Sequence, residues 1–370
     1  MPLSLAPPET ATAVLADRLV LAAQNQPVDR LVLAAQNQPV DRPPVWMLRQ
    51  AGRYLKSYRD LQEKYPSFRD RSEIPGLAVE ISLQPYRAFK PDGVIFFSDI
   101  LTPLAGMGVT FEIVDHKGPI LAETVRSQAQ VDALRPLNPE ASLPFVGEIL
   151  RTLCDELQGQ VPVLGFVGAP WTLATYLVEG QNSTYYSVIK EMAWQEPVLL
   201  HQMLAQLACS IATYALYRVQ NGAQMIQIFD SWAGHLTPQD YATFALPYQW
   251  QVIRAVKAIY PEVPVTLCVN ASAALLPLMA KSGADVIHVD WAIPMAQARA
   301  VLGDRPVQGN LDPCVLLGSR ELIRERTLDV IRQAGSRGHI MNLGQGILPN
   351  TPEENVRYFF DTVRSATCHS

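Results

Sequence analysis

From residue 44 onward the chain alternates short, almost wholly apolar runs with longer segments of amphipathic pattern. Continuous apolar runs of this length are typical of parallel strands that are buried on both faces. Eight such runs occur, at Val45–Leu48, Gly93–Phe97, Val161–Val167, Gln224–Phe229, Val263–Val269, Ala284–Val289, Pro306–Gly309 and His339–Leu343.

The segments around these runs predict helices. Eight strands that alternate with helices are typical of a single (β/α)8 barrel, a fold of the α/β class. A doubly wound sheet is the alternative, but no Gly-x-Gly-x-x-Gly motif follows an early strand to support it. Residues 109–125 alternate like a hairpin that leaves the barrel. We therefore expect one barrel domain over residues 44–370, with helices at Val188–Gln220, Pro238–Ile259, Ala273–Ser282, Ser319–Ala334 and Pro352–Ser365.

Residues 1–43 precede this pattern and are predicted to form an N-terminal helical extension. Its segment DRLVLAAQNQPV, at 17–28, is repeated letter for letter at 29–40. Each copy predicts a short helix ended by Pro27 or Pro39. Twelve residues at about 100° each rotate the second copy by about 120° relative to the first. We expect one copy to fill a given docking site and the other to pack poorly.

Composition narrows the class of protein. The 370 residues are 48% hydrophobic with a net charge of −5, which indicates a globular protein with a large core and no basic patch for nucleic acid. Five cysteines without Cys-x-x-Cys spacing favour a reducing compartment over disulfides or structural zinc. No uninterrupted apolar run approaches the length of a membrane span, and no basic region opens the chain. We expect a cytoplasmic protein with no membrane or nucleic-acid partner.

Candidate chemistry begins in the segment PVWMLRQAGRYLKSYR, at 44–59, where an apolar run ends in Arg49 and Gln50, with Arg53 close behind. Guanidinium stays charged at any working pH and binds carboxylate or phosphate through two parallel N–H bonds. Gly52 lies between the two arginines and allows backbone to approach a ligand closely. The segment predicts a pocket for a small polyanion; the alternative is a surface loop whose arginines pair with neighbouring acids.

Polar residues follow most of the other runs, as catalytic residues do in barrels. Asp99, in FFSDIL, has bulky apolar neighbours, so its pKa would rise unless N–H donors or cations stabilise its charge. We interpret it as an anion that recognises N–H groups of a ligand, with helix capping or an ion pair as the alternative. Tyr176 and Ser231 are polar groups on apolar walls and could equally be satisfied core groups. Asp290 and Asp312 could cap helices.

Further motifs give the chain a family resemblance. The segments PPVWMLRQAGRYLKSYR, PDGVIFFSDILTPLAGMG, GFVGAPWTLATYLVEG, IFDSWAG, VQGNLDP and NLGQGILPNTPEENV resemble the uroporphyrinogen decarboxylase family, in order over residues 44–365. SLQPYRAFKPDG and FSDILTPL are similar to its cyanobacterial and plant branch in particular.

The resemblance implies a homodimeric (β/α)8 enzyme of haem and chlorophyll synthesis. Such an enzyme removes the carboxyl groups of the four acetate side chains of uroporphyrinogen, giving coproporphyrinogen and CO₂, without cofactor or metal. The family's carboxylate-binding and proton-donating arginines fall on Arg49 and Arg53, and its central aspartate falls on Asp99. The resemblance further implies substrate contacts at Gln50, Tyr176, Ser231 and position 345.

The chain departs from the family pattern at several positions. Gln345 replaces the histidine of NLGHGI, which predicts weaker carboxylate binding because glutamine cannot become cationic. Ala271 replaces the glycine of Asn-Gly-Ser, at a cost of about 1 kcal/mol or more if that backbone needs positive φ. Gln181 replaces one glycine of Val-Glu-Gly-Gly, and the 12-residue duplication is absent from the pattern.

Two other functions stay open on the sequence. A tetrapyrrole-binding protein with weakened or lost catalysis would explain Gln345 and the missing glycines. A methyltransferase of the same superfamily would carry a zinc site with His-x-Cys, and no His-x-Cys occurs in this chain.

Overall fold

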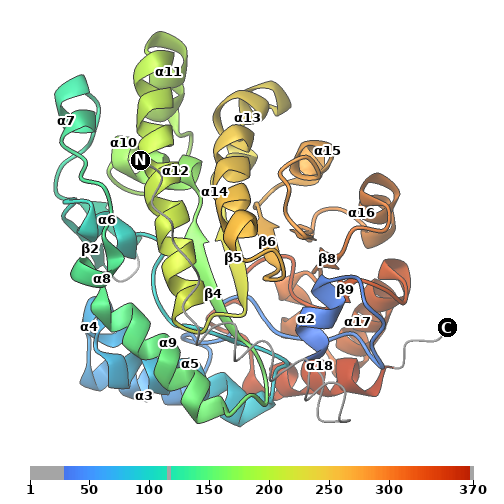
Figure 1. Ribbon diagram of the computed structural model, residues 1–370. Helices are drawn as coiled ribbons and strands as arrows, with labels where there is room; N and C mark the ends of the chain where they lie inside the picture. The colour runs from blue at the N-terminus through green and yellow to red at the C-terminus, as the bar shows by residue number, and fades with distance from the viewer. Residues whose placement is uncertain (1–28, 115–117, 367–370) are drawn as a thin grey trace.

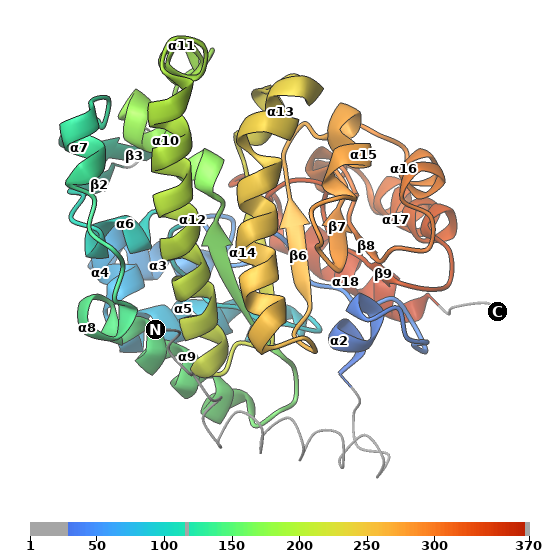
Figure 2. The ribbon, with the colours of Figure 1, turned by 45° about the horizontal axis from the view of Figure 1, so that its top comes forward.

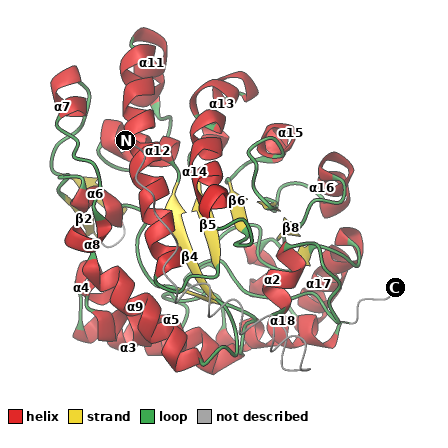
Figure 3. Ribbon diagram, in the orientation of Figure 1, coloured by secondary structure: helices red, strands yellow, loops and turns green. Residues whose placement is uncertain are grey.

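A computed structural model describes residues 29–114 and 118–366. Seven parallel strands form one sheet, enclosed by helices (Figure 3), in the order β1-β4-β5-β6-β7-β8-β9. The single-barrel expectation is confirmed, although most strands are shorter than the apolar runs that predicted them. Their bounds are β1 Val94–Ile95, β4 Val163–Gly168, β5 Met225–Phe229, β6 Val265–Cys268, β7 Val286–His288, β8 Val307–Gln308 and β9 His339–Ile340.

The first apolar run closes the ring as the eighth segment of the wall. Val45 makes an isolated parallel bridge with Met341, whose N–H donates to the carbonyl of Pro44 at 2.8 Å. On the other side the Asp92 N–H donates to the carbonyl of Val45 at 2.8 Å. Inside the barrel the Trp46 indole N–H donates to Gln308 Oε1 at 3.0 Å. The run therefore joins β9 to the start of β1 without forming a regular strand.

The helices cover the barrel in chain order (Figure 1), and two expected helices are interrupted. The stretch 188–220 breaks before Pro197 and the stretch 238–259 breaks before Pro247, because proline lacks the N–H that would continue a helix. The helices are α2 Arg30–Ala35, α3 Lys56–Lys64, α4 Phe68–Glu73, α5 Pro75–Phe89, α6 Thr102–Gly106, α7 Gln128–Asp132, α8 Pro139–Ser142, α9 Pro144–Leu157, α10 Pro170–Glu179, α11 Ser187–Gln195, α12 Pro197–Gln220, α13 Pro238–Phe244, α14 Leu246–Ile259, α15 Leu276–Met279, α16 Met295–Leu302, α17 Arg320–Ala334 and α18 Glu353–Ser365.

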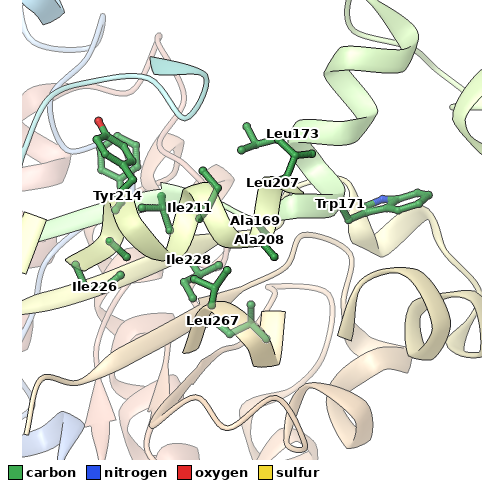
Figure 4. Packing of buried hydrophobic residues seen from close by; sticks show 14 of the residues in the cluster. Ala169, Trp171, Leu173, Leu207, Ala208, Ile211, Tyr214, Ile226, Ile228 and Leu267 are labelled. Carbon is green, nitrogen blue, oxygen red and sulfur yellow. The ribbon is translucent and has the colours of Figure 1, made fainter. Parts of the chain in front are cut away.

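Side chains on the outer face of the sheet pack against these helices. Figure 4 shows Ile226 and Ile228 of β5 close to Leu207 and Ile211 of α12, all fully buried. Burying one such side chain contributes about 1.5–3 kcal/mol. By length and hydropathy α12 is the one helix of the described ranges that could span a membrane, but 61% of its most apolar window is buried in the fold. It is therefore weak evidence for a membrane segment.

The predicted hairpin projects from the wall after β1. Strands β2 (Phe111–Val114) and β3 (Gly118–Leu121) pair antiparallel, with Phe111 opposite Leu121. The Leu121 N–H donates to the carbonyl of Gly180 at 2.8 Å, so the hairpin is attached to the end of α10. Gly180 has φ +80, a conformation that suits the glycine retained at this position.

The second copy of the duplicated segment forms α2, which covers the base of the barrel (Figure 2), opposite the strand arrowheads. Leu31, Ala34 and Ala35 are buried there. A Cβ on Gly93 would lie 2.6 Å from Leu31 Cδ2, so glycine at this position leaves room for the Leu31 side chain as the helix docks. The helix ends at Ala35, before Pro39 as predicted. The first copy, 17–28, lies outside the described residues.

Candidate active site

The carboxyl ends of the strands surround one end of the barrel, here called the mouth, and Arg49 lies there on a tight turn. The Gln50 N–H donates to the carbonyl of Met47 at 3.0 Å, and Arg49 has φ +58. Its side chain is exposed and makes no hydrogen bond or ion pair to any residue of the described ranges. Arg49 is thus a free cation at the mouth, as the polyanion-pocket hypothesis requires.

Gln50 and Arg53, the neighbours of Arg49 in the predicted site, have different environments. Gln50 is 1% exposed, and its side-chain amide donates to the carbonyl of Gly93 at 3.2 Å, so the structure does not bring this side chain to the mouth. Arg53 is exposed, and its carbonyl accepts from the Arg59 guanidinium at 2.8 Å. Arg59 also donates to the carbonyl of Tyr54 at 2.7 Å and therefore fixes the backbone that carries Arg53.

Asp99 follows β1 and lies within electrostatic reach of Arg49. Burial raises the pKa of its carboxyl to about 6, while the Leu101 N–H and the charge of Arg49 oppose this rise. One oxygen, Oδ1, accepts the Leu101 N–H at 2.8 Å. Asp99 as a residue stays partly exposed, so a ligand at the mouth can approach it. Its low-dielectric surroundings agree with the interpretation of FFSDIL.

Tyr176 extends the same site from α10. Burial raises the pKa of its hydroxyl, the nearby Asp99 carboxylate raises it further, and Arg49 lowers it. The phenol donates to Asn182 Oδ1 at 3.2 Å. Because Arg49 lowers the pKa of both Asp99 and Tyr176, and Asp99 raises that of Tyr176, the structure brings these three predicted residues together.

Aromatic rings form a wall beside Tyr176. Its ring lies 5.9 Å from that of Trp232 in an edge-on arrangement, and Tyr186 lies 5.2 Å from Trp232 and 4.4 Å from His235. Rings at these separations stack favourably with one another and offer flat apolar surface to a ligand. Ser231 immediately precedes Trp232, is partly exposed and makes no hydrogen bond that the described structure records.

The buried carboxylate of Asp230 supports this wall, a role that the sequence did not reveal. It accepts the Thr172 N–H at 3.1 Å, the Thr172 hydroxyl at 2.6 Å and the Gln249 amide at 2.7 Å. Burial raises its pKa to about 6 despite these bonds. Its position after a strand was visible in the sequence, but its partners come from α10 and α14.

Gln345 is exposed in the loop that follows β9, between Gly344 and Gly346. A Cβ on Gly346 would lie only 2.6 Å from Arg49 Cδ, which places this loop against the Arg49 side chain. Gln345 directly precedes the glycine that contacts Arg49. It therefore lies near the place where Arg49 would hold a carboxylate ligand.

The three remaining sequence expectations concern loop conformation. Ala271 has φ +52, so the condition under which alanine at this position carries a strain cost is met in this chain. Asp290 does not cap a helix as expected; its carboxylate accepts the N–H groups of Ala271 and Ala292, each at 2.8 Å. Asp312 does cap, accepting the Cys314 N–H at 2.8 Å at the start of the 3₁₀ helix Pro313–Leu317.

In the described ranges no group of His, Cys, Asp and Glu side chains is arranged to hold a metal ion. The chain's resemblance to solved structures extends to a methyltransferase from Methanosarcina mazei, with TM-score 0.74 at 18% identity over 90% of this chain and 97% of that one. A B12-independent methionine synthase from Shewanella gives a TM-score of 0.55 at 11% identity, covering 88% of this chain and 96% of the other. At such identities the likeness shows the barrel fold alone.

Sequence comparison is much more specific. The sequence pattern of "Uroporphyrinogen decarboxylase (URO-D)" matches residues 26–366. A uroporphyrinogen decarboxylase of Nostoc punctiforme is 60% identical over 87% of this chain and 92% of its own length. One from Synechococcus sp. is 61% identical over 95% of this chain and 98% of its own length. The chain belongs to the uroporphyrinogen decarboxylase family.

Proposed function

We propose that this chain decarboxylates the four acetate side chains of uroporphyrinogen III, giving coproporphyrinogen III and CO₂ in haem and chlorophyll synthesis. The close relatives carry the name of this activity over nearly the whole chain. The observation that carries the proposal is the group formed by Arg49, Asp99 and Tyr176 at the mouth. A substrate with eight carboxylates needs such free cations, and its pyrrole N–H groups need an acceptor.

Each group of the site has a role in this chemistry. Asp99, with a pKa of about 6, is ionised at neutral pH and accepts the pyrrole N–H groups. Arg49 and Arg53 bind acetate carboxylates and are the proton donors that the family resemblance implies. Protonating a pyrrole carbon makes an electron sink. The bond to CO₂ then breaks and its electron pair enters the ring. The exocyclic carbon left behind takes up a proton to become methyl, and the proton first added to the pyrrole carbon is released, which restores the neutral pyrrole. The Asp99 carboxylate offsets the positive charge that develops on the pyrrole.

The remaining predicted residues complete the binding site. Tyr176 and Ser231 contact the substrate from the aromatic wall, and Gln345 contacts a carboxylate as a neutral group. Gln50 acts through the turn that carries Arg49, because its amide is already bonded to Gly93.

We further propose a cytoplasmic homodimer that uses no cofactor and binds neither nucleic acid nor membrane. The net charge of −5 supports the absence of nucleic-acid binding, and the scattered cysteines support a cytoplasmic location. Large apolar side chains on and near α11, with Tyr185 80%, Val198 80% and Trp194 66% exposed, support an interface with a second copy.

The test is an anaerobic assay with freshly reduced uroporphyrinogen III that resolves each carboxylate intermediate, run beside Gln345→His and Asp99→Asn. Steady conversion to the four-carboxylate product, lost in D99N, is the expected result. Substrate that binds without conversion, and that Q345H converts, would mean an enzyme damaged at position 345. Binding without conversion in both proteins would favour the tetrapyrrole-binding alternative and overturn the proposal.

A further inference from the structure

The turn that carries Arg49 has an unusual residue at its third position. Its closing hydrogen bond runs from Gln50 N–H to the carbonyl of Met47, and Arg49 has φ +58 while Leu48 is not among the residues with positive φ. A positive φ at the third position alone defines a type II turn, which normally has glycine or asparagine there. An arginine persists in this conformation only if its surroundings hold it.

Those surroundings are the loop that follows β9, and Asn342 is its central residue. Asn342 is fully buried, and its Oδ1 accepts the Leu48 N–H at 2.9 Å and the Leu343 N–H at 2.8 Å. The Leu48 carbonyl accepts the Ile347 N–H at 3.2 Å. The loop thus binds Leu48 through both its N–H and its carbonyl, directly before Arg49.

The same loop also shapes the path of the Arg49 side chain. A Cβ on Gly346 would come within 2.6 Å of Arg49 Cδ and within 3.0 Å of its Cγ and Nε. The loop therefore acts on Arg49 in two ways: it holds the backbone at Leu48, and Gly346 leaves room for the arginine side chain. The Asn342 Nδ2 is buried without a hydrogen-bond partner in the described structure, so only the oxygen of this amide contributes to the support.

We propose that Asn342 is a positioning residue that places the Arg49 guanidinium at the mouth for a substrate carboxylate. It acts by accepting the Leu48 N–H and so holding the type II turn. This inference rests on the proposed function, in which Arg49 binds an acetate group. It adds that Asn342, which lies 294 residues after Leu48 in the chain, keeps Arg49 in place for that binding.

The experiment compares Asn342→Asp with Asn342→Leu in the full-length protein. Aspartate keeps the acceptor oxygen and puts an ionisable carboxyl oxygen in place of the unpartnered Nδ2, whereas leucine has similar volume and no acceptor. We expect N342L to raise the KM for uroporphyrinogen III at least tenfold with a smaller change in kcat, and N342D to stay within about threefold of the parent. Asn342→Ala replaces N342L if that variant fails to fold. Asn221→Ala, which removes an amide bonded to the Tyr217 carbonyl in the α12 C-cap, is the control.

Two readouts separate positioning from a merely structural role. Because Arg49 lowers the pKa of Asp99, N342L should shift the acid limb of the kcat/KM profile to higher pH. In an Arg49→Gln background, N342L should raise KM no further. An unchanged KM and acid limb in N342L, or additive effects of N342L and R49Q, would overturn the inference. If the parent protein itself converts no substrate, the proposed function fails first, before Asn342 is tested.

Discussion

The Asp290 carboxylate accepts the backbone N–H of Ala271 at 2.8 Å and holds that alanine at φ +52. An L-residue in this region has its Cβ too close to the backbone, at a cost of about 1–2 kcal/mol. A Cβ on the facing Gly234 would in turn lie 1.9 Å from the Asn270 carbonyl, so this loop cannot move toward Gly234 to relieve the strain.

Ala271→Gly should therefore stabilise the protein. We expect the free energy of unfolding to rise by about 1 kcal/mol, because relief of the left-handed strain exceeds the extra backbone entropy of glycine in the unfolded chain. Urea titration measures the change. Ala129→Gly, in the exposed helix α7, is the control and should lower stability by a similar amount. If Ala271→Gly and Ala129→Gly both destabilise the protein, the conclusion that Ala271 is strained would be contradicted.

Gly346→Ala should impair substrate binding with little change in stability. The new Cβ meets the flexible Arg49 side chain, which can swing away, so the fold tolerates the change while the guanidinium leaves its place. We expect KM to rise about tenfold, with the midpoint of thermal unfolding within about 2 °C of the parent. Gly76→Ala, at a helical position with open space around it, should leave KM unchanged and should not lower stability.

The pH dependence of activity should report Asp99. Its carboxylate must be ionised to accept pyrrole N–H groups, and its pKa is about 6, so kcat/KM should rise as the pH increases through 6. The positive charge of Arg49 holds this pKa down, so Arg49→Gln should move the acid limb upward. Asp230 has a similar pKa, but Arg49 does not contribute to it. If the acid limb does not move in R49Q, a group other than Asp99 is responsible for it.

Exchanging the carboxylate of Asp230 with the amide of Gln249 should test the hydrogen bond between them. In Asp230→Asn a new amide N–H₂ group can face the Gln249 donor, and we expect stability to fall by about 1–3 kcal/mol. Gln249 also accepts from the Tyr241 hydroxyl at 2.6 Å, so in the double variant D230N/Q249E a carboxylate can accept from both the new amide and that hydroxyl. The double variant should therefore recover most of the loss in urea titrations. Additive losses would contradict a direct bond between the two positions.

The duplicated segment gives a prediction of its own. Leu31→Ala should lower stability by about 2–4 kcal/mol, because Leu31 is fully buried between α2 and the wall. Leu19, the same letter in the first copy, lies outside the described residues, and Leu19→Ala should have no effect if only 29–40 fills the docking site. A silent L31A combined with a destabilised L19A/L31A double variant would show instead that the two copies exchange.

The barrel and the closeness of Arg49 to Asp99 followed from the sequence because they depend on local pattern. Parallel strands buried on both faces appear as apolar runs, and strand ends meet at the mouth, which gathered Arg49 and Asp99. The helix breaks before Pro197 and Pro247 have a local signal, because proline favours the first turn of a helix and interrupts its interior. The roles of Asp230 and Asn342 were not predictable, because their partners Thr172 and Leu48 lie 58 and 294 residues away. Nothing local to either residue indicates such a partner.

The closure of the wall by residues 44–48 has a consequence for how the protein is made. Their partners on one side, Met341 and Asn342, are almost the last part of the barrel to leave the ribosome. Domains generally fold as units, and contacts between residues that are distant in the sequence form late. The turn carrying Arg49 can be completed only when nearly the whole chain has emerged. A chain that stops short of these residues therefore lacks the groups that hold this turn, and with them a finished site for its polyanionic substrate.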